Sequence, residues 1–259
     1  MSGSYWRVIE SLQNGQAKIW EQLTESRGIR KHGEFLLAGR KSAPEALAAH
    51  PDRFHALLAL DPAQIEGWTI PAHVEKYRLS RALFDALDVS GTGAPLLVGK
   101  VPAMSLADLS AVPKGLELVC ALGDPNNLGA ALRSAAAFGA TRIILMSEAA
   151  HPFHPKALRA AANAQFELTL LRGPSWETLD EATGPIFALD AGGEDMAALD
   201  WPRDLRLVLG EEGRGIPSTL KLRRLSIPTT GAVESLNATV AASLALYAHY
   251  IAGRRASSS

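Results

Sequence analysis

"LELVCALGDPNNLGAALRSAAAFGATRIILM", residues 116–146, carries the clearest secondary-structure pattern of the chain. Two short apolar runs enclose an alanine-rich segment, a pattern typical of a strand, a helix and a second strand. Strands this apolar are buried on both faces, which predicts a mostly parallel α/β sheet covered by helices. Within the predicted helix, Arg133 is the only charged side chain between Asp124 and Arg142. Because an unpaired guanidinium is costly to bury, this residue indicates a function rather than packing.

The same alternation continues along the rest of the chain. We predict strands in FELTLL, PIFALD, RLVLG and RLSIP, and helices in PKALRAAANA, SWETLDEA, PSTLKLRR and ATVAASLALYAHYIAG. In parallel α/β sheets, ligands bind beyond the carboxyl ends of the strands. The loops that follow VCAL, RLVLG and RLSIP are therefore the candidate site segments.

The residues before this region predict a second, smaller α/β unit. Apolar side chains near one stripe favour a helix from Tyr5 to Arg27, and strands in EFLLAG, FHALLAL and APLLVGK alternate with helices in APEALAAH and SRALFDAL. The stretch VPAMSLADLSAVPKG is rich in Pro, Ser and Asp, as linkers are. We therefore expect two domains, 1–110 and 111–259.

Composition describes an ordinary globular protein. The net charge of −1 gives no general affinity for nucleic acid, although a local basic patch would suffice. The one cysteine, Cys120, cannot form a disulfide within the chain, and no segment resembles a signal peptide or a membrane span, so we expect a cytoplasmic protein. The prolines around His151 and His154 favour a loop over a metal site, and no metal is expected.

The three candidate loops read GDPNNLGAALR, GEEGRGIP and IPTTGAVESLN. The first contains only Gly123 and Gly129, so it lacks the GxGxxG turn of a dinucleotide fold or an ordinary class I methyltransferase. In the second, Gly210, Gly213 and Gly215 would let the backbone approach a ligand closely. An α/β nucleotide-binding enzyme of another class remains a weaker alternative.

Together and in this order, the three loops resemble the signature motifs of the SpoU family, the RNA ribose 2′-O-methyltransferases of the SPOUT superfamily. The resemblance covers roughly residues 116–252 and implies a parallel α/β domain with a C-terminal trefoil knot, S-adenosylmethionine as cofactor, RNA as substrate, and a homodimer. More loosely, SRGIRKHGEFLLAGRKSAPEAL resembles the start of the small L30e-like RNA-binding domain that is often fused to this catalytic domain. Where the family usually has a Ser-x-Gly, this chain has Ala161 and Asn163, which leaves the geometry of that loop open.

The resemblance also assigns roles to residues. The predicted catalytic residues are Asn127, Arg133, Glu212, Ser235 and Asn237. The predicted cofactor-binding residues are Leu209, Gly210, Gly215, Ile227, Pro228, Gly231 and Leu236. Arginine is effectively always protonated, so orienting the 2′-hydroxyl and stabilising its developing negative charge suits Arg133 better than general-base catalysis. A structural ion pair between Arg133 and Glu212 is the alternative.

Affinity for RNA requires basic groups that contact phosphate. The predicted substrate-binding residues are Arg27, Arg30, Lys31, Lys156 and Arg159, with Arg40 and Lys41 close to the first three in sequence. We expect the N-terminal cluster to contribute most. A non-catalytic RNA-binding or assembly protein on the same scaffold is the alternative function, although such a protein has no need of the five predicted catalytic residues.

Overall fold

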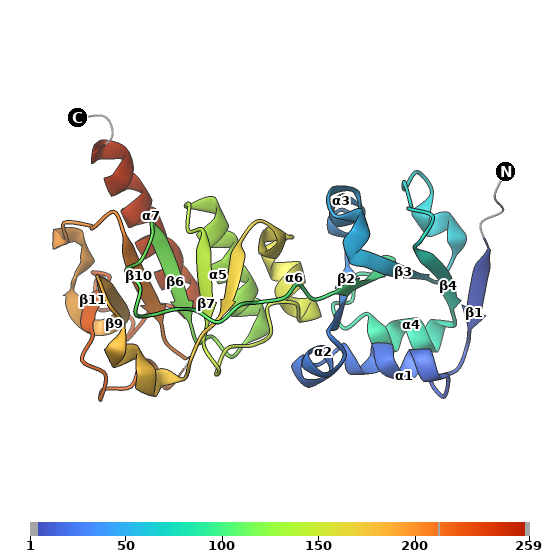
Figure 1. The fold of residues 1–259 in the computed structure, drawn as a ribbon, viewed down its shortest axis with the longest axis horizontal. Helices are drawn as coiled ribbons and strands as arrows, with labels where there is room; N and C mark the ends of the chain where they lie inside the picture. The colour runs from blue at the N-terminus through green and yellow to red at the C-terminus, as the bar shows by residue number, and fades with distance from the viewer. Residues whose placement is uncertain (1–4, 212, 257–259) are drawn as a thin grey trace. The chain divides into compact units, whose positions relative to one another are not determined.

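The computed structural model describes residues 5–211 and 213–256. Their contacts divide the chain into two compact units (Figure 1). The first contains the chain up to Pro102 together with His151–Asn163, and the second contains Ala103–Ala150 and the chain from Ala164 onward. We expected a single boundary near residue 110. The contacts instead end the first stretch of the first unit at Pro102 and add His151–Asn163 to it. Within the described ranges, no helix combines the length and the apolar character needed to cross a membrane.

The second unit is built on a six-stranded, all-parallel sheet, which confirms the predicted fold class. Its order is β11-β9-β10-β6-β7-β8. The strands are β6 (Leu116–Cys120), β7 (Arg142–Leu145), β8 (Thr169–Arg172), β9 (Ile186–Asp195), β10 (Leu205–Leu209) and β11 (Arg223–Ser226). The central strands β6 and β10 are buried along their whole length, as apolar parallel strands should be. The trefoil knot that the resemblance implies stays a prediction.

Two long helices cover one face of this sheet. Helices α5 (Pro125–Ala137) and α7 (Ala238–Ala256) lie side by side (Figure 1), and the hydroxyls of Ser134 and Ser243 meet at 2.7 Å between them. Helix α5 begins after Asp124, whose side chain accepts a hydrogen bond from the Asn127 amide at 2.9 Å and so caps the helix.

The opposite face packs against shorter segments. The 3-10 helix η4 (Trp176–Glu181) and the segment containing Ile216 and Leu220 share a buried cluster with strand residues such as Val208. The helix predicted in PSTLKLRR is wrong: the segment turns and enters β11. Burial of Leu220 and a 3.0 Å hydrogen bond from the Lys221 amide to Asp180 hold it in that turn.

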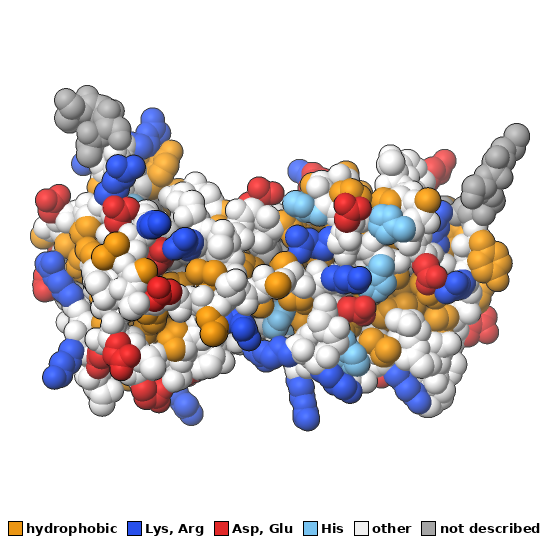
Figure 2. Space-filling view, in the orientation of Figure 1, with side chains coloured by type: hydrophobic (Ala, Val, Ile, Leu, Met, Phe, Trp, Pro, Cys, Tyr) orange, Lys and Arg blue, Asp and Glu red, His pale blue; other side chains and the backbone are white. Residues whose placement is uncertain are grey.

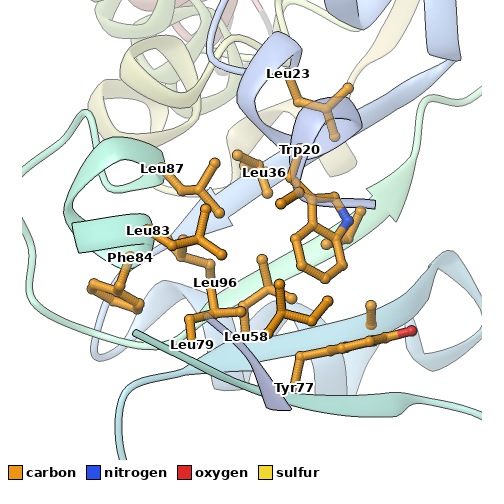
Figure 3. Packing of buried hydrophobic residues seen from close by; sticks show 14 of the residues in the cluster. Trp20, Leu23, Leu36, Leu58, Tyr77, Leu79, Leu83, Phe84, Leu87 and Leu96 are labelled. Carbon is orange, nitrogen blue, oxygen red and sulfur yellow. The ribbon is translucent and has the colours of Figure 1, made fainter. Parts of the chain in front are cut away.

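The first unit contains a mixed five-stranded sheet of order β1-β4-β3-β5-β2, in which β5 runs antiparallel to both neighbours. Its strands are β1 (Trp6–Ile9), β2 (Glu34–Ala38), β3 (Phe54–Ala59), β4 (Glu75–Leu79) and β5 (Leu96–Lys100). Its helices are α1 (Gly15–Gln22), α2 (Ser26–His32), α3 (Ser42–Ala49), α4 (Arg81–Leu87) and α6 (Pro155–Ala161). Figure 3 shows its core, in which the rings of Trp20 and Tyr77 meet edge to face at 5.0 Å and to which α4 contributes Leu83 and Leu87.

The helix predicted from Tyr5 to Arg27 is wrong in its first half. Residues 6–9 form the strand β1, which pairs in parallel with β4, and Arg7 forms a 2.9 Å ion pair with Glu75 of that strand. The helix begins only after Asn14, whose side chain caps the amides of Gln16 and Ala17. Strand pairing and a strong cap override the helical spacing of the apolar residues.

The departure at Ala161 and Asn163 has a defined geometry. Helix α6 ends at Ala161, and the next two residues, Ala162 and Asn163, both take left-handed backbone conformations with φ of 48° and 70°. The Asn163 amide group donates a 2.8 Å hydrogen bond to the Ser42 carbonyl. This contact lies within the first unit, and it explains how a non-glycine residue is held there.

Candidate functional site

A pocket of about 620 Å³ lies where the middle of β9 meets the segments after β10 and β11. It belongs entirely to the second unit. Predicted site residues that line it are Leu209, Gly210, Gly215, Ile227, Ser235, Leu236 and Asn237. The position agrees with the rule that parallel α/β sheets bind ligands beyond the carboxyl ends of their strands.

The loop after β10 folds back on itself. Glu211 and Gly215 exchange two backbone hydrogen bonds, of 3.2 and 2.8 Å. Gly213 and Gly215 have positive φ values of 81° and 67°. At Gly210, a Cβ atom would lie 2.6 Å from the carbonyl carbon of Gly215. Glycine is thus required for this tight wall of the pocket.

A bulge in β9 forms the facing wall, and none of its residues was predicted as a site residue. Arg224 of β11 pairs with Ala188, but the next residue, Leu225, pairs with Glu194. Residues 189–193 are therefore left out of this ladder, and the first three of them line the pocket. Gly193 closes the bulge, because a Cβ there would lie 2.5 Å from the backbone of Arg224. The signal was present, since PIFALD is another strand end and is followed by AGG.

The loop after β11 supplies the third side of the pocket. Ile227 and Leu236 line it and are half-buried, and the exposed residues Thr229 and Glu234, which were not predicted, line it as well. Asn237 also caps α7, because its side-chain oxygen accepts a 2.9 Å hydrogen bond from the Thr239 amide. Two predicted cofactor-binding residues of the same loop, Pro228 and Gly231, are exposed and lie outside the described lining.

The two predicted catalytic residues on α5 do not line the pocket. The Thr239 hydroxyl lies 3.2 Å from both the carbonyl and the side-chain oxygen of Asn127, which ties the start of α5 to the start of α7. Arg133 is exposed, so the cost of burying an unpaired guanidinium does not arise at this position. Glu212 lies outside the described residues, and its predicted ion pair with Arg133 stays a prediction.

The charges around the pocket suit a ligand with a positive charge. The lining contains the carboxylates of Asp190, Glu211 and Glu234 and the guanidinium of Arg214. Asp190 is ion-paired with Arg224. The carboxylates of Glu211 and Glu234 then outnumber the one guanidinium of the lining, that of Arg214. Among the described side chains, no three of His, Cys, Asp and Glu are grouped as metal ligands would be.

The predicted RNA-binding residues lie in the first unit. Arg27, Arg30 and Lys31 are exposed on α2, and Lys156 and Arg159 are exposed on α6. Figure 2 shows Lys and Arg side chains gathered over the region of α2. That α6 belongs to the same unit as α2 was not predicted from the sequence. Its attachment comes from packing on β2 and from a hydrogen bond of Arg159 to the Ser90 carbonyl.

Comparisons with known proteins agree with this geometry. The SpoU rRNA Methylase family matches residues 118–247. The "Ribosomal RNA small subunit methyltransferase G 2" of Syntrophobacter fumaroxidans is 41% identical over 244 residues, which cover 94% of this chain and 49% of that protein. The "23S rRNA (guanosine(2553)-2′-O)-methyltransferase RlmP" of Bacillus subtilis is 30% identical over 248 residues, which cover 93% of this chain and 98% of that protein. The SpoU methyltransferase AviRb from Streptomyces viridochromogenes, solved in complex with AdoMet, has 26% identity, a TM-score of 0.75, and coverage of 95% of this chain and 99% of that one.

The fold and the pocket define an α/β protein with a ligand site at the carboxyl edge of a parallel sheet. By the extent of the family match and the near full-length similarity to the Bacillus relative, this chain belongs to the SpoU rRNA methylase family. The chain spans about half of the length of the Syntrophobacter relative, so that relative's name does not define the activity of the matched half.

Proposed function

We propose that this protein methylates the 2′-hydroxyl of a ribose in ribosomal RNA, with S-adenosylmethionine as the methyl donor. The observation that carries the proposal is the pocket itself, in which the glycine loop, the β9 bulge and the loop before α7 enclose one space. The names of the Bacillus relative and of a Streptomyces viridochromogenes relative, both 23S rRNA 2′-O-methyltransferases, support the reaction. The AdoMet-bound structure of AviRb supports the cofactor.

The residues present fit this cofactor. Gly210 and Gly215 let the backbone approach closely, Ile227 and Leu236 offer apolar contacts to an adenine ring, and the acidic lining suits a sulfonium. When bound, S-adenosylmethionine supplies the electrophilic methyl carbon, so the protein has to position the nucleophile and exclude water. The cofactor would give its methyl group to the ribose oxygen and leave as S-adenosylhomocysteine, and the hydroxyl proton would pass to solvent.

Arg133 is the proposed catalytic residue that contacts the substrate. Its guanidinium stays protonated and donates hydrogen bonds to the ribose oxygen as negative charge develops there. Its exposure leaves it available to a phosphate or hydroxyl of the RNA. Asn127, Ser235 and Asn237 complete the polar surroundings, and the Thr239 hydroxyl positions the first of them.

A homodimer is the proposed state of the enzyme. The α7 residues Val240, Leu244 and Tyr247 are 48%, 39% and 50% exposed and follow the spacing of one helix face. Such an apolar face suits a second copy of the chain. Association through this face would bring a partner subunit close to α5, which carries Arg133 and packs against α7.

The exposed arginines and lysines of the first unit are the proposed RNA-binding surface. Arg27, Arg30 and Lys31 occupy one short helix, and Lys156 and Arg159 add charge from α6 of the same unit. Phosphate contacts of this kind supply affinity and register rather than base specificity.

The proposed function is tested by mapping methylated riboses in ribosomal RNA from cells with and without the gene. We expect one ribose methylation to disappear with the gene and to return when purified protein and S-adenosylmethionine are added to that RNA. Tight RNA binding without any methyl transfer would instead support a non-catalytic RNA-binding protein.

A further inference from the structure

Two neighbouring arginines of β11 have different surroundings. Arg223 forms a 2.8 Å ion pair with Glu194, and both side chains are more than half exposed, at 51% and 61%. Arg224 forms an ion pair with Asp190, and these side chains are only 23% and 30% exposed. Both carboxylates belong to β9, but Asp190 lies in the bulge that lines the pocket, whereas Glu194 follows the bulge.

Arg224 also contacts the other wall of the pocket. Its guanidinium donates a 2.8 Å hydrogen bond to the carbonyl of Pro217 and a longer one, of 3.5 Å, to the carbonyl of Ile216. Both carbonyls follow directly after the glycine loop, and Ile216 itself lines the pocket. One side chain therefore joins the β9 bulge to the end of the loop after β10.

This arrangement requires arginine chemistry. The carboxylate and the Pro217 carbonyl are engaged by different nitrogens of the guanidinium, which a planar fork can reach at once. A lysine ammonium at the same place would be a single point charge and could not hold both walls in one geometry. The half-burial of the pair also makes it less screened by solvent than the pair of Arg223.

We propose that Arg224 is a positioning residue for cofactor binding, which fixes the separation of the two pocket walls through Asp190 and the Pro217 carbonyl. It does so without contributing to RNA affinity. This inference rests on the proposed function, because it takes S-adenosylmethionine as the ligand of the pocket.

The test compares Arg224→Met with Arg223→Met, a matched control on the same strand. Calorimetry with S-adenosylhomocysteine should show about tenfold weaker binding for the Arg224 variant, because a hydrogen bond to a charged group is lost. The control should bind within about twofold of wild type, since exposed ion pairs contribute little. For methyl transfer, we expect KM for S-adenosylmethionine to rise with kcat largely retained, and the RNA affinity of both variants to stay at the wild-type value.

Two further variants keep the inference testable if Arg224→Met does not fold. Arg224→Lys and Asp190→Asn should each weaken cofactor binding, while Glu194→Gln should not. In folded proteins, combining Asp190→Asn with Arg224→Met should cost less affinity than the sum of the single losses, because both remove the same contact. Equal effects of the Arg224 and Arg223 variants, or a lower melting temperature with unchanged affinity, would overturn the inference. Failure of the wild-type protein to bind either cofactor form would instead contradict the proposed function.

Discussion

An exposed arginine on an alanine-rich helix keeps its charge in water, so it costs the fold no desolvation free energy. Its five N–H donors stay available to a ligand. Arg133 is the only charged residue in α5, and its neighbours Leu132 and Ala135 are buried against the rest of the second unit. The helix is therefore held by its apolar face, and the guanidinium is presented on the other. The packing of α5 therefore does not depend on the Arg133 side chain. A substitution of Arg133 can test its proposed role in catalysis without disturbing that packing.

Arg133→Ala should reduce methyl transfer by about two to three powers of ten, the usual loss when one oriented electrostatic donor is removed. Cofactor affinity and melting temperature should stay close to wild type, because the side chain is exposed. Arg133→Lys should restore little activity, since an ammonium lacks the planar fork. Arg203→Ala, at another exposed arginine of the second unit, serves as control. Normal turnover and a strongly reduced melting temperature in Arg133→Ala would contradict the catalytic role and favour a structural ion pair instead.

One of the two buried histidines described in the first unit, His151, predicts a dependence of stability on pH. Burial, followed by the charges of Arg30 and His154, lowers the pKa of His151 from 6.5 to about 4. Below pH 6.5 the His151 imidazole is protonated in the unfolded chain, whereas in the folded protein it stays neutral down to about pH 4. The free energy of unfolding therefore decreases as the pH falls from 6.5 to about 4. The loss amounts to about 3 kcal/mol from this group.

Urea unfolding at pH 7 and at pH 4.5 measures this effect. His151→Gln cannot titrate, so its stability should decrease less between the two pH values than that of wild type. His50→Gln, at a half-buried histidine of the same unit, controls for the general effect of acid. Equal acid sensitivity of wild type and His151→Gln would contradict the assignment.

At the scale of elements, the loop after β10 depends on a close backbone approach. Gly210→Ala places a methyl group 2.6 Å from the Gly215 backbone and 2.8 Å from Ile216, so the loop has to move. We expect affinity for S-adenosylhomocysteine to fall by about tenfold or more, while the melting temperature changes little. Gly253→Ala in α7, where a Cβ meets no atom within 4 Å, should leave the affinity unchanged. Wild-type affinity in Gly210→Ala would show that the loop is not a wall of the site.

The elements that the sequence predicted are those with a strong local signal. The strands β6 and β10 and the helix α5 were predicted because apolar runs and an alanine-rich segment act over a few residues. The β9 bulge depends on which β11 residue pairs with which β9 residue, and β4 was missed because its exposed, charged residues give no apolar run. Pairing between strands that are distant in the sequence cannot be predicted from the local order of apolar and polar residues.

The same limit applies to the buried ion pair of the second sheet. Glu117 and Arg206 lie in two apolar strands, are 2% and 1% exposed, and contact each other at 2.9 Å. Arg206 also donates to the carbonyls of Ala111 and Thr183, so it fastens the segment before β6 to the sheet. Neither strand alone contains a partner for its buried charge. The two charges become neighbours only through the register in which β6 pairs with β10.

At the scale of the whole molecule, the proposed dimer accounts for two features that one subunit leaves open: the apolar face of α7 and the exposure of Arg133. Leu244→Lys puts a charge in the centre of that face, where desolvation on association would be costly. We expect wild type to sediment at twice the chain mass of 27.6 kDa and Leu244→Lys to sediment at 27.6 kDa. The monomeric variant should also lose methyl transfer, since Arg133 would lack its partner subunit. Val112→Lys, at another exposed apolar residue of the second unit, should remain dimeric and active. If wild type sediments only as a 27.6 kDa species and is fully active, the dimer is excluded and Arg133 must act within its own subunit.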